Sequence, residues 1–260
     1  MKKRRTLVVT STFPQYEDDE RGVFLRRHWE QQAARGEDVS VLVPKTAWTD
    51  DGFRPDVRTR RFSYAPRRMA SLTGHFGVLE NIRERWWRAL LVPAYLWALY
   101  RAVTRELAEG SYDRVVAHFW LPSGLIVAWC CAGRIPFELY GHGTDVDMIM
   151  GLPAWLKRRV TLRLAQAQAL YVPSSRKRAA ILDALGWDDI AHKVHVEHMS
   201  HTVAVGAEAS PRELERDYVL FLGRLIDQKG VNVLLEAASE HPGLCVVIAG
   251  DGPLLSLIHI

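Results

Sequence analysis

Short apolar runs alternate along this chain with longer segments of helical pattern. The apolar runs predict strands at Thr6–Thr10, Val39–Val43, Arg114–Ala117, Phe137–Tyr140, Ala169–Val172, Tyr218–Leu222 and Leu244–Ala249. The segments between them predict helices at Phe24–Arg35, Ser123–Cys131, Leu156–Gln168 and Val231–Glu240. This alternation is typical of an α/β fold in which helices flank parallel sheets.

A break in the pattern divides the chain into two domains. Gly206, Ser210 and Pro211 predict a linker over residues 206–216, between a first domain at residues 1–205 and a second at residues 217–260. The second domain has two predicted strands and one predicted helix, too few to bury both faces of a parallel sheet. We therefore expect an incomplete second domain in a C-terminally truncated fragment. The apolar residues 254–260 fit a prematurely ended terminus.

Composition narrows the class of protein. The chain has 34 Lys and Arg against 30 Asp and Glu, a formal charge of +4. This mild excess suits anionic ligands or a membrane surface, and we do not expect nucleic acid as a partner. The three cysteines have neither disulfide nor metal-ligand spacing, and the apolar run after Lys2–Arg5 is too short for a signal peptide. We expect a cytoplasmic protein.

The most informative stretch follows the predicted strand Tyr218–Leu222. Gly223-Arg224 and Lys229-Gly230 place two cations beside the start of a helix, whose first N–H groups have no intrahelical acceptors. Arg224 can hold two phosphate oxygens with its planar guanidinium, and Lys229 adds a point charge. The stretch predicts a diphosphate site at Gly223, Arg224 and Lys229. The alternative is a solvated turn with a charged rim.

Loops after the other strands are further candidates, because ligands of parallel sheets bind beyond the carboxyl ends of the strands. Gly22 opens a helix and either admits a ligand close to backbone N–H groups or is a plain helix start. His118 and Trp120 follow the strand that ends at Ala117. An imidazole and an aromatic face suit a sugar, and buried rings in a capped turn are the alternative.

The strongest of these loops is Gly141-His142-Gly143-Thr144-Asp145. Glycines on both sides of His142 let the backbone approach a ligand while the ring projects beyond the strand. Thr144 and Asp145 can fix the ring or contact hydroxyl groups. We predict His142 as the main catalytic residue, with Asp145 beside it.

Several of these segments resemble glycosyltransferase family 4, also called glycosyl transferase group 1. The resemblance is carried by Gly141–Asp145, by Tyr218–Ala237 and by Val246–Pro253. In that family, residues matching Arg224 and Lys229 bind the diphosphate of the donor.

The same resemblance implies roles in the first domain. The residue that matches His142 contacts the donor sugar and the reaction centre in the family. The His-x-Trp-x-Pro-x-Gly stretch that begins at His118 lines the acceptor side, and the loop with Gly22 lies where donor and acceptor sites meet. The resemblance thus places His118, Trp120, Thr144 and Gly22 on the acceptor side or at its interface.

The resemblance implies a GT-B fold of two Rossmann-like domains, the first binding an acceptor and the truncated second binding a nucleotide sugar. It implies retaining transfer of a hexosyl group from a nucleoside diphosphate sugar to a glycan or lipid-linked acceptor, in cell-surface polysaccharide synthesis. No metal or other cofactor is expected, because protein cations would neutralise the diphosphate. A Glu-x7-Glu pattern that relatives carry does not occur after Gly252, so we expect little or no activity from this chain.

Other functions share parts of this pattern. A GT-B sugar-nucleotide epimerase would use the same phosphate contacts without an acceptor, and a non-catalytic fragment would only bind an acceptor. A dinucleotide-dependent oxidoreductase is disfavoured, because Gly141-His-Gly143 and Gly250-Asp-Gly252 both lack the third glycine of its fingerprint.

A histidine cluster invites a metal hypothesis that its spacing disfavours. His192, His195, His198 and His201 recur at every third position. Val194 and Val196 alternate as in a strand, which would turn these histidines to different faces. We predict no metal site.

An arginine- and tryptophan-rich segment is a candidate for membrane contact. Arg83, Arg85 and Arg88 precede Ala89–Tyr100, which is uncharged but too short to span a bilayer. Cations near a helix start oppose its dipole and suit an external anion such as a lipid phosphate. Peripheral attachment to an anionic inner membrane face is the prediction, and a core helix with a solvated end is the alternative.

Overall fold

The computed structural model describes residues 3–74, 78–198, 217–252 and 254–255. The chain divides into two compact units, unit 1 (residues 1–202) and unit 2 (residues 203–260), which are described separately. The predicted linker at residues 206–216 lies outside the described residues, and the predicted domain boundaries stay a prediction.

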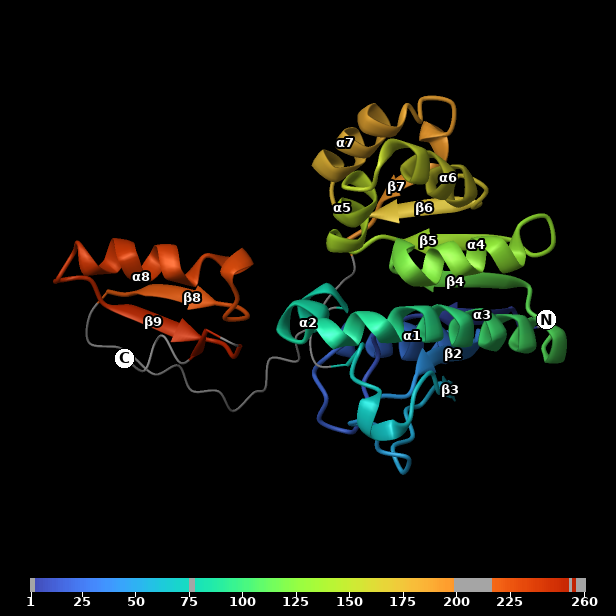
Figure 1. The fold of residues 1–260 in the computed structure, drawn as a ribbon, viewed down its shortest axis with the longest axis horizontal. Coiled ribbons are helices and arrows are strands. Elements are labelled where there is room, and N and C mark those ends of the chain that lie inside the picture. The colour runs from blue at the N-terminus through green and yellow to red at the C-terminus, as the bar shows by residue number, and fades with distance from the viewer. Residues whose placement is uncertain (1–2, 75–77, 199–216, 253, 256–260) are drawn as a thin grey trace. The chain divides into compact units, whose positions relative to one another are not determined.

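Unit 1 is built on a parallel sheet whose seven described strands run in the order β3-β2-β1-β4-β5-β6-β7 (Figure 1). Every neighbouring pair is parallel, so all carboxyl ends lie at one edge of the sheet. The strand order reverses between β1 and β4, and open sheets of this kind bind ligands beside such a switch point. The strands are β1 (Arg5–Val9), β2 (Asp38–Pro44), β3 (Arg58–Phe62), β4 (Arg114–His118), β5 (Phe137–Tyr140), β6 (Ala169–Val172) and β7 (Val194–Val196).

Helices cover both faces of this sheet. The helices are α1 (Val23–Ala34), α2 (Val78–Glu84), α3 (Val92–Glu109), α4 (Leu125–Cys131), α5 (Thr144–Met150), α6 (Ala154–Leu164) and α7 (Ser175–Leu185). Short helical turns add η1 (Arg67–Met69), η2 (Trp86–Leu91), η3 (Trp120–Gly124) and η4 (Ala191–Lys193).

Alternate residues of each strand enter different cores, because side chains alternate across a strand. Leu7 and Val9 pack in a core with α3, α4, α6 and α7, whereas Val8 packs on the other face with Leu25 and Trp29 of α1. Five of the strands predicted from the sequence correspond to β1, β2, β4, β5 and β6. In the sheet these five strands are consecutive neighbours. The α/β prediction is confirmed.

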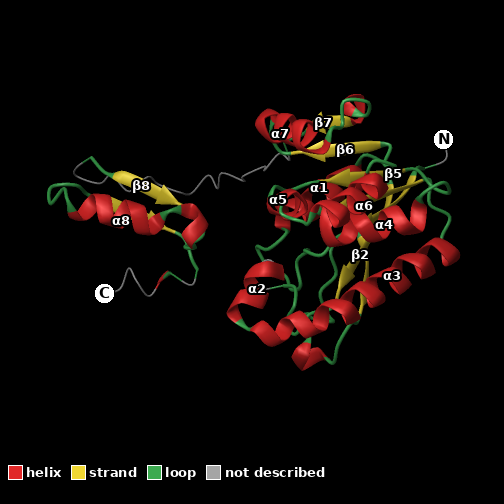
Figure 2. Cartoon of the chain, turned by 45° about the horizontal axis from the view of Figure 1, so that its top comes forward, coloured by secondary structure: helices red, strands yellow, loops and turns green. Residues whose placement is uncertain are grey.

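Unit 2 contains the parallel pair β8 (Val219–Leu222) and β9 (Val246–Ala249), the turn η5 (Asp227–Lys229) and α8 (Val231–Ser239) (Figure 2). Gly250 is required by a close approach of the two strand tips: a Cβ there would lie 1.8 Å from the carbonyl oxygen of Gly223. Leu222 and Val233 are more than two-thirds exposed in this unit.

No helix in the described ranges is both long and apolar enough to cross a bilayer.

Candidate functional site

His142 lies in the loop between β5 and α5, at the carboxyl edge of the sheet. Gly143, the next residue, has a φ of 107°, which favours glycine. The half-buried His142 ring packs against two aromatic rings, Phe119 after β4 with a centroid distance of 4.5 Å and Phe24 of α1 at 5.5 Å. Three loops or helix ends from different parts of unit 1 therefore converge on this imidazole.

Asp145 holds the backbone of this loop rather than the imidazole ring. Its Oδ1 accepts a hydrogen bond from the backbone N–H of His142 at 2.9 Å, and its Oδ2 accepts one from the backbone N–H of Trp120 at 2.6 Å. The side chain is 3% exposed, and burial raises the pKa of its carboxyl group while the two backbone donors oppose that shift. Asp145 thus ties the loop after β5 to the loop after β4.

His118 connects His142 to helix α1. Trp29 Nε1 donates a hydrogen bond to His118 Nε2 at 2.9 Å, and His118 Nδ1 lies 3.1 Å from His142 Nε2. Burial lowers the pKa of His118 well below 6.5 and lowers that of His142 to about 4. Both rings are neutral at pH 7, so His142 presents a hydrogen-bonding imidazole and not a cation.

The turn at the tip of β8 is built from backbone hydrogen bonds to the neighbouring strand. Gly223 N–H donates to Ala249 O at 3.0 Å, and Leu225 N–H donates to Asp251 O at 2.8 Å. Arg224 and Lys229 are both exposed on this turn, and neither forms an ion pair with a described carboxylate. Their charges are available to an anion in solution.

Comparison with known proteins shows the fold of the chain. It matches no protein-family model and no curated protein sequence. Among solved structures it is similar to the apo form of the lipopolysaccharide outer core galactosyltransferase WaaB, with a TM-score of 0.57, 14% identity, and coverage of 97% of this chain and 62% of that one. A trehalose-6-phosphate synthase from E. coli bound with UDP-2-fluoro glucose has a TM-score of 0.59 at 14% identity, covering 96% and 64%. The chain has a GT-B fold.

A third GT-B structure, Arabidopsis thaliana UGT89C1 complexed with UDP-L-rhamnose, gives a TM-score of 0.55 at 14% identity, covering 97% of this chain and 69% of that one. The chain therefore spans less than two-thirds of the length of WaaB and of the E. coli protein. These similarities extend to the GT-B fold and not to family 4 in particular.

Unit 1 of this GT-B chain brings most of its predicted site residues together. Gly22 caps α1 with a φ of 72°, two residues before Phe24. Thr144 is exposed at the first position of α5. His118 and Trp120 are completely buried, as in the alternative of buried rings, and their contact with an acceptor stays a prediction.

Sequence reasoning missed Trp29 and did not select Phe24 or Phe119 as site residues, although both lie in the loops it considered. Only the fold shows that Trp29 reaches His118 and that Phe24 reaches His142. Phe119 follows His118 in the stretch that sequence reasoning selected, but its φ of 69°, a strained value for a residue with a side chain, could not be predicted.

The predicted histidine cluster is spread over several elements. His192 lies in η4, His195 is exposed on β7 beside the buried Val194, and His198 follows that strand. His201 lies outside the described residues. Within the described ranges, no three potential ligands gather into a metal-binding group.

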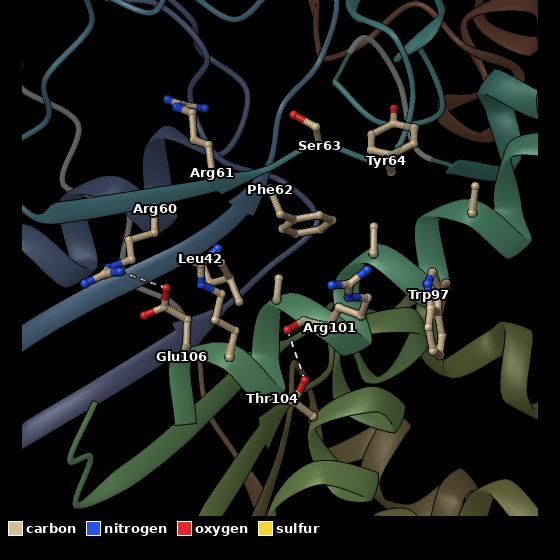
Figure 3. Close-up of a pocket in the computed structure, with 14 residues that line it drawn as sticks. Leu42, Arg60, Arg61, Phe62, Ser63, Tyr64, Trp97, Arg101, Thr104 and Glu106 are labelled. Carbon is tan, nitrogen blue, oxygen red and sulfur yellow. Dashed lines mark hydrogen bonds and ion pairs between the residues drawn. The ribbon is translucent and has the colours of Figure 1, made fainter. Parts of the chain in front are cut away.

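A groove of about 1010 Å³ runs along α3 and the edge strand β3 (Figure 3). Phe62 and Leu42 line its floor, while Arg60 pairs with Glu106 at 3.2 Å. The predicted site residues do not line this groove, so its size alone does not identify the functional site.

Proposed function

We propose that this chain is part of a retaining glycosyltransferase of family 4 type. The reaction is transfer of a hexosyl group from a nucleoside diphosphate sugar to a glycan or lipid-linked acceptor in cell-surface polysaccharide synthesis. The observation that carries the proposal is the neutral His142 imidazole at the carboxyl edge of a GT-B sheet, in a loop whose backbone is held by the buried carboxylate of Asp145. Two of the similar structures hold UDP-sugars, which supports a nucleotide-sugar donor.

The predicted catalytic and diphosphate-binding residues each have a role in this proposal. His142 contacts the donor sugar near the reaction centre, and Asp145 positions its backbone. Gly223, Arg224 and Lys229 bind the diphosphate. A preorganised donor that stabilises charge growing on a leaving group lowers a barrier by about 3–4 kcal/mol. The cations come from the protein, so the proposal includes no metal and no cofactor besides the donor.

The proposal places the protein in the cytoplasm, peripherally bound to the inner membrane face. Trp86, Leu90 and Trp97 are 76%, 71% and 61% exposed, the first two in η2 and the third in α3, which follows η2 directly. Arg83, Arg85 and Arg101 are exposed along the same segment. We call these six residues, which run from the end of α2 through η2 into α3, the α3 surface. Tryptophan and cations together suit an anionic lipid interface.

Arg88 is a correction to the predicted membrane contact. It is 7% exposed, and its Nη1 donates to Glu84 Oε2 at 2.6 Å and to Asn81 O at 3.0 Å. Because its guanidinium is buried and paired inside unit 1, Arg88 stabilises the fold and does not face a lipid phosphate.

Calorimetric titration of the full 260-residue chain with UDP, GDP and ADP tests the donor site. We expect saturable binding of at least one of them. Removing both cations with Arg224→Ala and Lys229→Ala should weaken binding at least tenfold, about 1.4 kcal/mol, because each charge-assisted hydrogen bond contributes more than this. Arg158→Ala with Arg159→Ala removes the same charge from the exposed face of α6 and is the matched control.

Two outcomes would overturn the proposal. The first is no binding of any of the three nucleotides, and the second is equal weakening by both double variants. Incubation with UDP-glucose and no acceptor provides a further check. Conversion to an isomeric nucleotide sugar would replace the transferase by an epimerase.

A further inference from the structure

Three side chains form a continuous hydrogen-bonded chain through the interior of unit 1. It runs from Trp29 in α1 to His118 at the end of β4 and on to His142 in the loop after β5. Its two nitrogen-to-nitrogen distances are 2.9 and 3.1 Å. Trp29 is 1% exposed and His118 is fully buried, so water does not compete for these hydrogen bonds.

Counting hydrogens gives this chain one direction. An indole N–H can only donate, so His118 Nε2 must accept and carries no hydrogen. A neutral imidazole has a single N–H, which in His118 is then on Nδ1 and points at His142 Nε2. His142 Nε2 must accept in turn, and its own hydrogen is on Nδ1.

The other arrangements all place two N–H groups against each other. A hydrogen on His118 Nε2 would face the indole N–H at 2.9 Å. A doubly protonated His142 would turn Nε2–H toward His118 Nδ1–H at 3.1 Å. A buried pair of opposed donors loses a hydrogen bond and leaves a desolvated donor without an acceptor.

The remaining nitrogen of His142 is available to a ligand. Nδ1 forms no hydrogen bond to a described residue, and it is not among the buried polar atoms that lack a partner. It therefore keeps contact with solvent, on a ring that packs against Phe24 and Phe119.

We propose that His118 is a positioning residue which, oriented by Trp29, fixes His142 as a neutral imidazole that presents Nδ1–H to the ligand. His142 then donates a hydrogen bond from Nδ1 to an oxygen atom of the ligand. It does not act as a general base that takes a proton from a hydroxyl group. That this oxygen belongs to a donor sugar rests on the proposed function; the tautomer does not. The site should accept a hydroxyl at this position and discriminate against an ammonium group there.

Long-range 1H–15N NMR of the ligand-free, 15N-histidine-labelled chain at pH 7 tests the proposal. We expect His118 and His142 each to show a protonated Nδ1 and an unprotonated Nε2. The chain has 10 histidines, so His118→Gln and His142→Gln variants assign the two signals. Observation of Nε2–H on either residue, or of a mixture of tautomers at His142, would overturn it.

A Trp29→Phe variant separates the effect of the hydrogen-bonded chain from Trp29 to His142, which we call the relay, from the effect of packing. Phenylalanine keeps an aromatic ring in the core but removes the N–H, so His118 is free to change its tautomer. We expect Nε2–H to appear on His142 and its pH midpoint to rise by about one unit, a tenfold change in proton affinity. Trp187→Phe alters another buried tryptophan, which packs on Trp120 rather than on these histidines, and should change neither signal.

Unchanged His142 signals in a Trp29→Phe protein with a native amide spectrum would refute the role of Trp29. Should that variant fail to fold, the tautomers of the unmodified chain decide the proposal alone. Because the spectra contain no ligand, their outcome is independent of nucleotide binding. Failure of UDP binding with the expected tautomers would refute the proposed function and leave the relay standing.

Discussion

The carboxylate of Asp145 accepts a hydrogen bond from the backbone N–H of Trp120, with 2.6 Å between Oδ2 and the nitrogen. The two residues lie 25 positions apart and follow different strands. The same carboxylate accepts the backbone N–H of His142. One buried side chain therefore sets the spacing between the loops after β4 and β5, and with it the distance between the His118 and His142 rings.

Replacement of Asp145 by Asn should destabilise unit 1 by about 1–3 kcal/mol, because the amide NH2 would face one of the two backbone donors and leave it unsatisfied. Urea unfolding of the chain measures this change. Asp147→Asn on the same helix is the matched control. Asp147 is 62% exposed in its ion pair with Lys177, so its loss should change stability by less than about 1 kcal/mol. Equal effects of the two variants would contradict the role given to Asp145.

Two features of Gly22 disfavour a larger residue, its positive φ and the close approach of Phe13. A matched pair of variants can measure them separately. Gly22 and Gly133 have φ values of 72° and 71°, but a Cβ at Gly22 would lie 3.0 Å from the Cα of Phe13, whereas a Cβ at Gly133 would meet nothing within 4 Å. Gly133→Ala should cost about 1–2 kcal/mol for the left-handed conformation alone. Gly22→Ala should cost about 1–3 kcal/mol more, from the contact with Phe13.

Thermal and urea unfolding of the two alanine variants measure the difference. A Gly22→Ala protein as stable as Gly133→Ala would show that the first loop moves freely away from the start of α1. That result would remove the steric reason for a glycine at this point.

The strand-tip loops could be predicted from sequence because buried parallel strands are continuous apolar runs, and the residues after them are easily found. The prediction reached His142 and Asp145 in this way. It missed β3, where the sequence Arg58–Phe62 alternates exposed arginines with partly buried positions on a sheet edge. A polar edge strand lacks the apolar run by which the other strands were recognised.

Contacts between distant segments could not be predicted from one sequence. Trp29 and His118 are 89 positions apart, and their hydrogen bond exists only because α1 packs across β4. Asp145 was expected to fix the His142 ring or contact hydroxyl groups, whereas in the structure it accepts hydrogen bonds from two backbone N–H groups. Its position in the loop was visible, but its bond to Trp120 depended on the β4–β5 pairing.

Acid should destabilise unit 1 through His142. The folded chain lowers the pKa of this imidazole from 6.5 to about 4, so between these values the unfolded chain binds more protons and stability falls as pH falls. This single group accounts for a loss of about 3 kcal/mol between pH 6.5 and pH 4. Well above pH 6.5 it has no effect, because the imidazole is then neutral in both states.

Other groups near His142 also change the stability of unit 1 with pH, so the contribution of His142 must be measured as a difference between two proteins. His118 acts in the same direction, as does His28 beside Trp29, whereas the raised pKa of Asp145 acts in the opposite direction. Urea unfolding at pH 4 and pH 7 should therefore be compared for the unmodified chain and His142→Gln. We expect a smaller loss of stability on acidification in the variant. An unchanged loss would show that His142 is protonated as easily in the folded chain as in the unfolded one.

The α3 surface should bind anionic membranes. Sedimentation of the chain with vesicles of phosphatidylglycerol and phosphatidylcholine at low salt should be lost when Trp86, Leu90 and Trp97 are all changed to serine. Each exposed apolar side chain that enters the interface contributes about 1.5–3 kcal/mol when fully buried, and the neighbouring arginines about 1 kcal/mol each. Binding should also weaken with added salt and be weak to pure phosphatidylcholine vesicles.

Trp155→Ser is the control for this surface. Trp155 is 66% exposed on α6, outside the α3 surface, so its removal lowers the exposed aromatic area without touching the proposed contact. Vesicle binding should be unchanged in this variant. If the chain does not sediment with anionic vesicles, or if Trp155→Ser reduces binding as much as the triple variant, membrane attachment through α3 is wrong. The exposed tryptophans would then be ordinary surface residues of η2 and of α3, whose other side, with Tyr95 and Leu99, packs in the core.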